Sequence, residues 1–334
     1  MENLKPGFQF LSYKLTKCLG KGKFGSVWSA TDESADQEVA IKFNGPPVPE
    51  SILLHESDIL REISHCESFP NYIGNGKESG LAYLIQEKFG VSLRYYMESR
   101  CNSPIKLNKT AKIGIKMLQC IQNFHDSGYV HRNIKPSNFV FRGDPSQLKM
   151  YLIDYKLAKR WCSPEGEVYP PRENVGFRGT KVYASINSHE GKDLSRRDDL
   201  FSLMYVLDEL CAPPLPWSSQ RDAEIIYDMK KQVSERWIFS NYMPRQFRNF
   251  EEHVRSLKFE EKPDYDLLTD LLKEVSEMDD YDSNPLNSNF ILGLEYIESS
   301  TSVDGSWSEN FINPNKNSDD IDDNKNETNC CVIC

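Results

Sequence analysis

Three glycines and a lysine near the start of the chain have the types and spacing needed to bind phosphate. The run Gly20-Lys21-Gly22-Lys23-Phe24-Gly25-Ser26-Val27 precedes Val39-Ala40-Ile41-Lys42. Glycine allows a close backbone approach, and backbone N–H groups and an ammonium attract phosphate oxygens. Such a run also opens dinucleotide-binding folds, but a helix follows it there. Here a strand pattern follows, which predicts a β-hairpin with Lys42 on the next strand; a plain glycine-rich hairpin is the alternative for the loop alone.

A second group of polar residues lies about ninety residues further on. The segment His131-Arg132-Asn133-Ile134-Lys135-Pro136-Ser137-Asn138 follows a long helical pattern. The run Leu152-Ile153-Asp154-Tyr155-Lys156 then predicts a strand that ends in an acid. Together with the glycine-rich loop and Lys42, these segments resemble the protein kinase motif set in order and spacing.

The elements that must position these residues fall into two regions. In the first region, alternating and β-branched patterns predict strands at 13–19, 26–31, 38–43 and 81–86. Helical spacing of apolar residues predicts one helix, at 52–63, between the third and fourth strands. Beyond Gly90 the patterns predict helices, notably 109–127 and 200–210, and helical segments continue to about Met278. Gly128 follows the first of these, where a helix end favours positive φ.

Further landmarks resemble the casein kinase 1 group, including the tau-tubulin kinases. Tyr183-Ala184-Ser185-Ile186-Asn187 stands where most kinases carry Ala-Pro-Glu, and the segments 195–200, 215–217 and 257–265 are similar to later landmarks of the group. The resemblance covers roughly residues 10 to 285. It implies an α+β bilobal kinase fold, with an N-terminal extension at 1–12, a small lobe at 13–88, a large lobe at 89–285 and a tail at 286–334.

The resemblance also implies the roles of individual residues in binding ATP and Mg²⁺. Lys42, oriented by Glu56, would hold the α- and β-phosphates, and Asn138 and Asp154 would bind magnesium through hard oxygen donors. Lys135 matches the catalytic-loop lysine, Asp199 the carboxylate that holds this loop by its backbone, and His131 a structural residue. The other residues expected to contact the nucleotide are Gly20, Gly22, Gly25, Val27, Ala40, Gln86 in the gatekeeper position, and Glu87 and Phe89 in the hinge.

One departure from the family pattern concerns the catalytic base. His-Arg-Asp becomes His131-Arg132-Asn133, so the aspartate that accepts the substrate hydroxyl proton is missing. An amide oxygen accepts a hydrogen bond but has no useful basicity near neutral pH. General-base catalysis typically contributes about 10² to 10⁴ in rate, so Asn133 predicts a severely slowed kinase or a pseudokinase. A conservative exchange with a modest cost is the alternative.

Two more departures lie downstream. Asp154-Tyr155-Lys156 replaces Asp-Phe-Gly: tyrosine fits the phenylalanine position if its hydroxyl finds a partner, whereas lysine loses the positive-φ conformations of glycine. Val182 stands where the group has an arginine that binds acidic or phosphorylated substrates. Lys181 is next to it, but neighbouring side chains on an extended backbone point to opposite sides, so Lys181 is not expected to replace this arginine. The preference of the group for acidic substrates is therefore not expected here.

Composition excludes several other classes of protein. The 334 residues are 39% hydrophobic and 27% charged, with a net charge of −10, which argues against a collagen, a wholly disordered chain, a polytopic membrane protein or a general nucleic-acid binder. No run resembles a signal peptide. We therefore expect a cytoplasmic protein whose scattered body cysteines are mostly isolated core thiols.

The C-terminal region carries a separate signal. From Ser300 onward it has seven acidic and two basic residues and no periodicity, which is typical of disorder. The ending Cys331-Val332-Ile333-Cys334 resembles a prenylation signal, with Cys330 as a site for palmitoylation. A redox or metal-binding Cys-x-x-Cys pair and an unmodified thiol cluster are the alternatives, so lipid anchoring to a membrane is a hypothesis.

The sequence thus favours an ATP-binding kinase homologue that acts in signalling by protein interaction. An active serine/threonine kinase, with protein substrates, is the competing hypothesis because Lys42, Glu56, Lys135, Asn138 and Asp154 are all retained.

Overall fold

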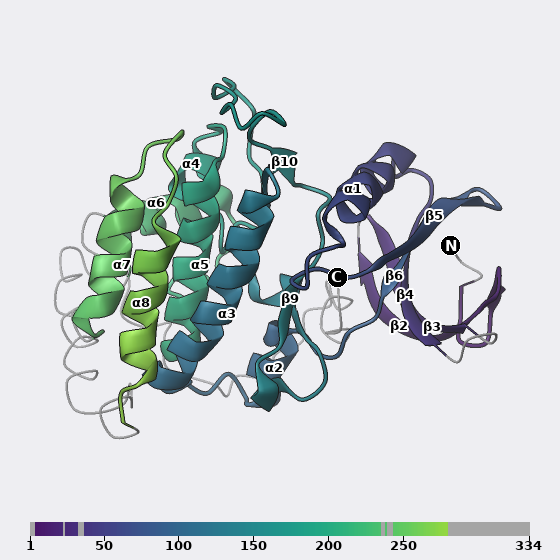
Figure 1. The fold of residues 1–334 in the computed structure, drawn as a ribbon, viewed down its shortest axis with the longest axis horizontal. Helices are drawn as coiled ribbons and strands as arrows, with labels where there is room; N and C mark the ends of the chain where they lie inside the picture. Colours follow the sequence, from purple (N-terminus) through teal and green to yellow (C-terminus); the bar gives the residue numbers. More distant parts are fainter. Residues whose placement is uncertain (1–3, 23, 33–36, 235–237, 239–242, 280–334) are drawn as a thin grey trace, which may run out of the picture.

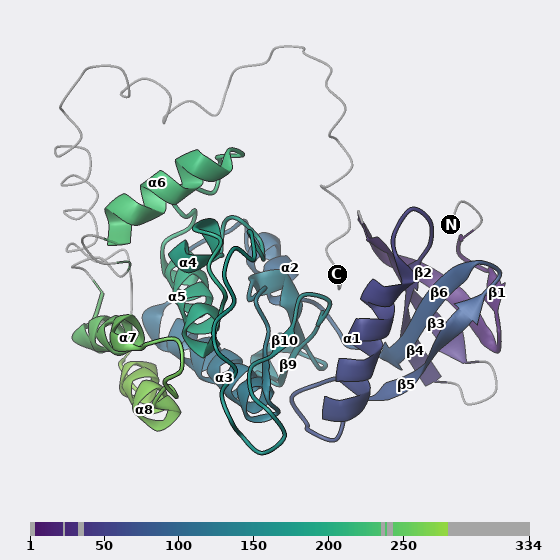
Figure 2. The same cartoon turned by 90° about the horizontal axis from the view of Figure 1, so that it is seen from above.

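The computed structural model describes residues 4–22, 24–32, 37–234, 238 and 243–279, which form two lobes (Figures 1 and 2). The small lobe is a six-stranded antiparallel sheet with the order β1-β2-β3-β4-β6-β5, accompanied by one helix. Its elements are β1 (Gln9–Phe10), β2 (Tyr13–Gly22), β3 (Gly25–Asp32), β4 (Gln37–Asn44), α1 (Glu50–Ile63), β5 (Tyr72–Glu78) and β6 (Leu81–Glu87).

The large lobe is mainly helical. Its helices are α2 (Leu93–Ser99), α3 (Leu107–Asp126), α4 (Ile186–His189), α5 (Arg196–Cys211), α6 (Ala223–Ser234), α7 (Arg245–Ser256) and α8 (Tyr265–Ser276). Two short antiparallel pairs lie on the side that faces the small lobe: β7 (Tyr129–Val130) with β10 (Lys159–Arg160), and β8 (Phe139–Phe141) with β9 (Met150–Leu152). The 3₁₀ turns η1 (Pro136–Asn138) and η2 (Pro145–Gln147) lie in the connections next to β8 and β9.

Helical periodicity explains why α3 and α5 form the centre of the large lobe. One face of α3 buries Ile113, Met117, Leu118, Ile121 and Phe124, as the 3.6-residue period requires of an amphipathic helix. By contrast, α5 is buried nearly all round. Figure 1 shows α3 beside both α5 and α8, so these helices form one continuous core.

The structure confirms the predicted bilobal α+β architecture. The predicted small-lobe strands and the predicted helices are present, and Gly128 has φ +86 after α3, as expected. The strand predicted to end at Asp154 instead ends at Leu152, as β9, so Asp154 lies just beyond it. Strand β5 was not predicted, because Tyr72–Glu78 contains two glycines and three polar residues and has no apolar alternation. The lobe boundaries stay predictions, and the tail, with Cys330 and Cys331, lies outside the described residues.

Two other sequence expectations can be compared with the described residues. Of the six body cysteines, Cys120, Cys162 and Cys211 are buried, Cys18 and Cys66 are half-buried, and Cys101 is exposed, so half of them are core residues. Among the helices described, none combines the length and the apolar character that crossing a membrane would require.

Candidate active site

Lys42 and Glu56 form a buried ion pair across the small lobe. Lys42 lies on β4 and Glu56 on α1, which packs on the rest of the protein through Leu53, Ile59, Leu60 and Ile63. The Lys42 ammonium donates to Glu56 Oε1, and the same oxygen accepts the backbone N–H of Tyr155 at 3.2 Å. The pairing inferred from the sequence is therefore present, and it also connects α1 to the Asp154 segment.

The glycine-rich loop forms the hairpin between β2 and β3. Gly20 pairs with Val27 and Gly22 with Gly25; Lys23 lies outside the described residues. Gly25 has φ +140, and a Cβ there would collide with the Phe43 carbonyl oxygen, whereas a Cβ at Gly22 would meet nothing within 4 Å. Glycine is thus required at position 25 for a close backbone approach, whereas no neighbouring atom requires it at position 22.

An apolar cluster lies between the two lobes. It combines residues of the sheet, the hinge and the β8–β9 pair: Leu19, Val27, Ala40, Phe89, Val140, Tyr151 and Ile153. Phe89 and Tyr151 are stacked with ring centroids 4.1 Å apart. Flat apolar walls of this kind suit an aromatic base. Val27, Ala40 and Phe89 were expected here. The other four were missed because the short apolar runs around Val140 and Ile153 have the appearance of ordinary buried strands.

Gln86 and the hinge residue Glu87 differ in their surroundings. Gln86 on β6 pairs with Ala40 across the sheet and is buried, and its Nε2 has no hydrogen-bond partner among the residues described. The Glu87 carboxylate accepts from Asn71 Nδ2 at 2.9 Å and pairs with Arg142 at 3.1 Å. Its side chain is therefore engaged with these two residues and not with the apolar cluster.

Asp199 at the start of α5 holds the catalytic loop by its backbone. Its carboxylate accepts the N–H of His131 at 2.7 Å, the N–H of Arg132 at 2.8 Å and His125 Nε2 at 2.9 Å. Arg132 has φ +62, an uncommon backbone conformation that these bonds help to fix. Burial opposes ionisation, but the hydrogen bond and charge of His125 hold the pKa of Asp199 below its usual value.

His131 packs in the interior as a structural residue. Its Nε2 lies 3.1 Å from the Ile153 carbonyl oxygen, and its ring meets Phe124 edge-on. Burial lowers the pKa of His131, which favours the neutral ring. These contacts agree with the structural role expected from the sequence.

Asn133 is buried and bonded on both its side chain and its backbone. Its Oδ1 accepts a 2.8 Å hydrogen bond from Thr180 Oγ1, and its backbone carbonyl accepts Asn138 Nδ2 at 2.9 Å. Lys135 lies two residues further on and is half-buried. The loop thus retains an ordered arrangement, with an amide at the position where the family has a carboxylate.

Asn138 and Asp154 present oxygen atoms suited to magnesium. Asn138 Oδ1 is buried and has no hydrogen-bond partner within the described part of the chain. Asp154 is also buried, and the ammonium groups of Lys156, Lys42 and Lys135 lower its pKa although burial acts in the opposite direction. An unsatisfied amide oxygen and an ionised carboxylate are hard donors of the kind that Mg²⁺ prefers, so these residues fit the ion.

The Asp154-Tyr155-Lys156 segment corrects one expectation and supports another. The Tyr155 hydroxyl donates to the Leu152 carbonyl, and its ring stacks on Phe124, so tyrosine fills the phenylalanine position as anticipated. Positive φ occurs at Asp154 (φ +73) and not at Lys156. The expected backbone cost of lysine at position 156 is therefore absent in this conformation. Instead, Lys156 Nζ bonds Asp154 Oδ2 at 2.9 Å.

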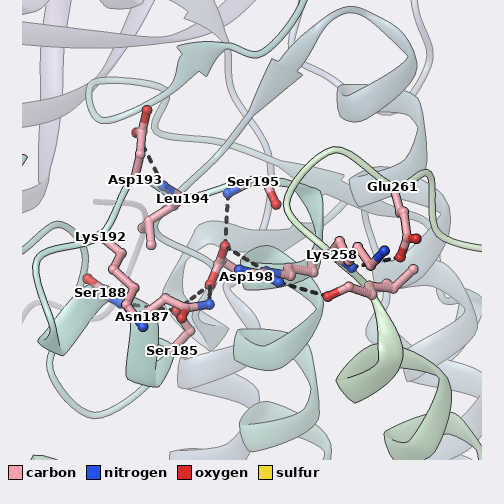
Figure 3. Close-up of polar contacts among 12 residues, drawn as sticks. Ser185, Asn187, Ser188, Lys192, Asp193, Leu194, Ser195, Asp198, Lys258 and Glu261 are labelled. Atoms are coloured by element: carbon pink, nitrogen blue, oxygen red, sulfur yellow. Dashed lines mark hydrogen bonds and ion pairs between the residues drawn. The ribbon is translucent and has the colours of Figure 1, made fainter. Parts of the chain in front are cut away.

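The segment that replaces Ala-Pro-Glu is anchored to α5 (Figure 3). Asp198 Oδ1 accepts Ser185 Oγ at 2.7 Å and Asn187 Nδ2 at 2.9 Å, and Oδ2 accepts the Ser195 N–H at 2.9 Å. Burial raises the pKa of Asp198, while these donors oppose the shift. Side-chain hydrogen bonds thus connect this segment to the large lobe without the Ala-Pro-Glu acid.

Lys181 and Val182 lie in a turn and not on the extended backbone expected from the sequence. The Tyr183 N–H bonds the Thr180 carbonyl at 2.9 Å, which closes this turn. Lys181 Nζ bonds the Arg221 carbonyl at 2.9 Å, and Val182 packs against the core. The side chains of Lys181 and Val182 therefore do point in different directions, but the cause is the turn and not an extended backbone.

Comparison with known proteins identifies the protein kinase family, as the sequence motifs suggested. The protein kinase domain family matches residues 13–282. A probable serine/threonine-protein kinase of Dictyostelium discoideum is 37% identical over 263 residues, which is 78% of this chain. The match spans about half (53%) of that relative's length. With the domain match covering most of the chain, and with an ion pair, a glycine-rich hairpin and a catalytic loop in matching places, the chain belongs to the protein kinase family.

Proposed function

We propose that this chain is a casein kinase 1-like protein that binds ATP with Mg²⁺ and transfers phosphate slowly or not at all. The observation that carries the proposal is Asn133: its Oδ1 is bonded to Thr180 Oγ1, in a loop that Asp199 holds in place. An amide at this point can orient a substrate hydroxyl but cannot accept its proton. Signalling would then proceed through protein contacts.

The nucleotide side of the cleft supports ATP binding. Lys42, paired with Glu56, is available to neutralise phosphate charge, and the apolar cluster around Val27 and Ala40 offers walls for the base. Asn138 and Asp154 would hold magnesium, which neutralises charge on the phosphates when it is bound. Lys135 would lie near the transferred group.

An active serine/threonine kinase is the second proposal. It is favoured by the Lys42–Glu56 pair, the unsatisfied Asn138 Oδ1 and the ordered loop, because positioning and electrostatics supply much of phosphoryl-transfer catalysis. The two proposals differ in how strongly an asparagine at position 133, in place of aspartate, lowers the rate of phosphate transfer. Membrane anchoring through lipidated Cys330 and Cys331 also remains a proposal from the sequence, tested by mass spectrometry of the C-terminal peptide from the native host.

The deciding experiment measures γ-phosphate transfer to casein and to the protein itself, for the wild type, Asn133→Asp and Lys42→Met. A silent wild type with transfer gained by Asn133→Asp would support the slowed-kinase proposal. Ordinary rates in the wild type, abolished in Lys42→Met, would contradict it and favour the active kinase. Lys42→Met also controls for contaminating kinases, since it removes the phosphate-binding ammonium.

A further inference from the structure

Lys156 places an ammonium group beside the carboxylate that would bind metal. Lys156 Nζ lies 2.9 Å from Asp154 Oδ2, and the side chain of Lys156 is only 22% exposed. The same ammonium lies 5.3 Å from the centre of the Phe24 ring, at the tip of the glycine-rich hairpin. Lys156 therefore sits between the loop expected to cover the phosphates and the acid expected to coordinate their metal ion.

The charges around Asp154 differ from those of a site with glycine at position 156. The ammonium groups of Lys42, Lys135 and Lys156 all act on Asp154, whereas the carboxylates in this group are Asp154 and Glu56. Three positive charges against two negative charges leave a net charge of +1. With glycine at position 156 the balance would be zero, and a bound metal ion would have to supply the excess positive charge for a polyphosphate.

We propose that the Lys156 ammonium acts as a built-in cation for the nucleotide phosphates, so that the cleft binds ATP without requiring a divalent metal ion. The inference rests on the proposed ATP binding and deepens it. Asn138 Oδ1, which has no hydrogen-bond partner among the described residues, remains for one metal ion when one is present. Two features of the geometry support the proposal: the direct bond to Asp154 and the position of Lys156 beneath Phe24.

The test is calorimetric titration of the full chain with a non-hydrolysable ATP analogue, in excess Mg²⁺ and in excess EDTA. The variants are Lys156→Met, which removes the charge and keeps the bulk, and Lys156→Arg, which keeps a charge. Lys77→Met, which breaks the exposed ion pair with Glu50, is the matched control. Adenosine, which has no phosphates, reports separately on the apolar cluster.

We expect the wild type, Lys156→Arg and Lys77→Met to bind the analogue in EDTA within about threefold of their affinity in Mg²⁺. Lys156→Met should lose about tenfold or more in EDTA, because one charge contact to phosphate is gone, and should bind adenosine unchanged. Equal Mg²⁺ dependence in the wild type and Lys156→Met, with adenosine still bound, overturns this inference alone. Failure of every protein to bind either ligand overturns the proposed function, and this inference with it.

Discussion

Thr180 Oγ1 donates a 2.8 Å hydrogen bond to Asn133 Oδ1, which connects the segment before Tyr183 to the catalytic loop. An aspartate at position 133 would accept the same bond, so Asn133→Asp should preserve this connection. In that variant we expect Thr180→Val to lower phosphate transfer by about ten- to a hundredfold, because the new carboxylate is then less well positioned. The nucleotide affinity should stay constant.

The measurement for this pair is the initial rate of transfer in Asn133→Asp, with and without Thr180→Val. Thr16→Val is the matched control, since Thr16 Oγ1 bonds the Ser29 carbonyl at 3.1 Å within the small-lobe sheet. An unchanged rate in the Thr180 variant would show that the hydrogen bond does not position residue 133.

Asp208 predicts an unusual dependence of stability on pH. It is buried on α5, and burial together with the charges of Glu251 and Glu209 raises its pKa to about 8. In the unfolded chain an aspartate titrates near about 3.9. Between roughly pH 4 and about 8, the folded protein therefore keeps a proton on Asp208 that the unfolded chain has already lost. Because the folded state binds more protons in this window, the unfolding free energy falls as the pH rises through it.

We expect the Asp208→Asn variant to remove up to about 1.4 kcal/mol per pH unit from the fall in unfolding free energy across this window. Urea unfolding of the variant and the wild type at several pH values measures the difference. Asp270→Asn, which changes an exposed aspartate on α8, is the control. Parallel pH profiles for the wild type and Asp208→Asn would contradict the expectation.

The two loop glycines should respond differently to the same substitution. Gly25→Ala places a Cβ against the Phe43 carbonyl at a φ of +140, whereas Gly22→Ala places it in open space. We expect Gly25→Ala to cost about 1–3 kcal/mol of stability and to weaken nucleotide binding, and Gly22→Ala to have little effect. Thermal unfolding with and without nucleotide checks both variants; similar losses in the two would disprove the steric explanation.

Tyr155 should matter more for its ring than for its hydroxyl. The ring is fully buried and stacks on Phe124, while the hydroxyl makes one bond to the Leu152 carbonyl. We expect Tyr155→Phe to cost about 0.5–1.5 kcal/mol and Tyr155→Ala about 3–5 kcal/mol of unfolding free energy. Chemical denaturation measures both, and a larger loss in the phenylalanine variant than in the alanine variant would contradict this ranking.

Periodicity and turn chemistry were enough to predict most elements that hold the site. Helix α3 follows from its 3.6-residue period, because it buries one apolar face. The β2–β3 hairpin and β4 follow from glycine spacing and from β-branched and apolar residues, and β3 and β4 are buried on both faces. Strand β5 could not be predicted in this way, since its pairing with β6 and not its own side chains defines it.

The site itself was only partly predictable. The Lys42–Glu56 pair and the backbone contacts of Asp199 followed from family resemblance, because residue spacing alone does not bring α1 to β4 or α5 to the catalytic loop. The bond from Lys156 to Asp154 was missed for a different reason. The sequence suggested a backbone cost at position 156, but the direction of a flexible side chain depends on the packing around it.

The bonds of Asp199 also have a consequence for the order in which the protein assembles. His125 donates to Asp199 through Nε2. Its other ring nitrogen, Nδ1, lies 2.6 Å from the hydroxyl oxygen of Tyr265, a residue 140 positions later in the chain. During synthesis the chain emerges N-terminal end first, so the bonds of the His131 and Arg132 N–H groups can form only once α5, which carries Asp199, has been made, and the His125–Tyr265 bond only once α8 has been made. The hydrogen-bond network that supports this loop is therefore complete only when α8 is present, although the residues of the loop itself are made much earlier.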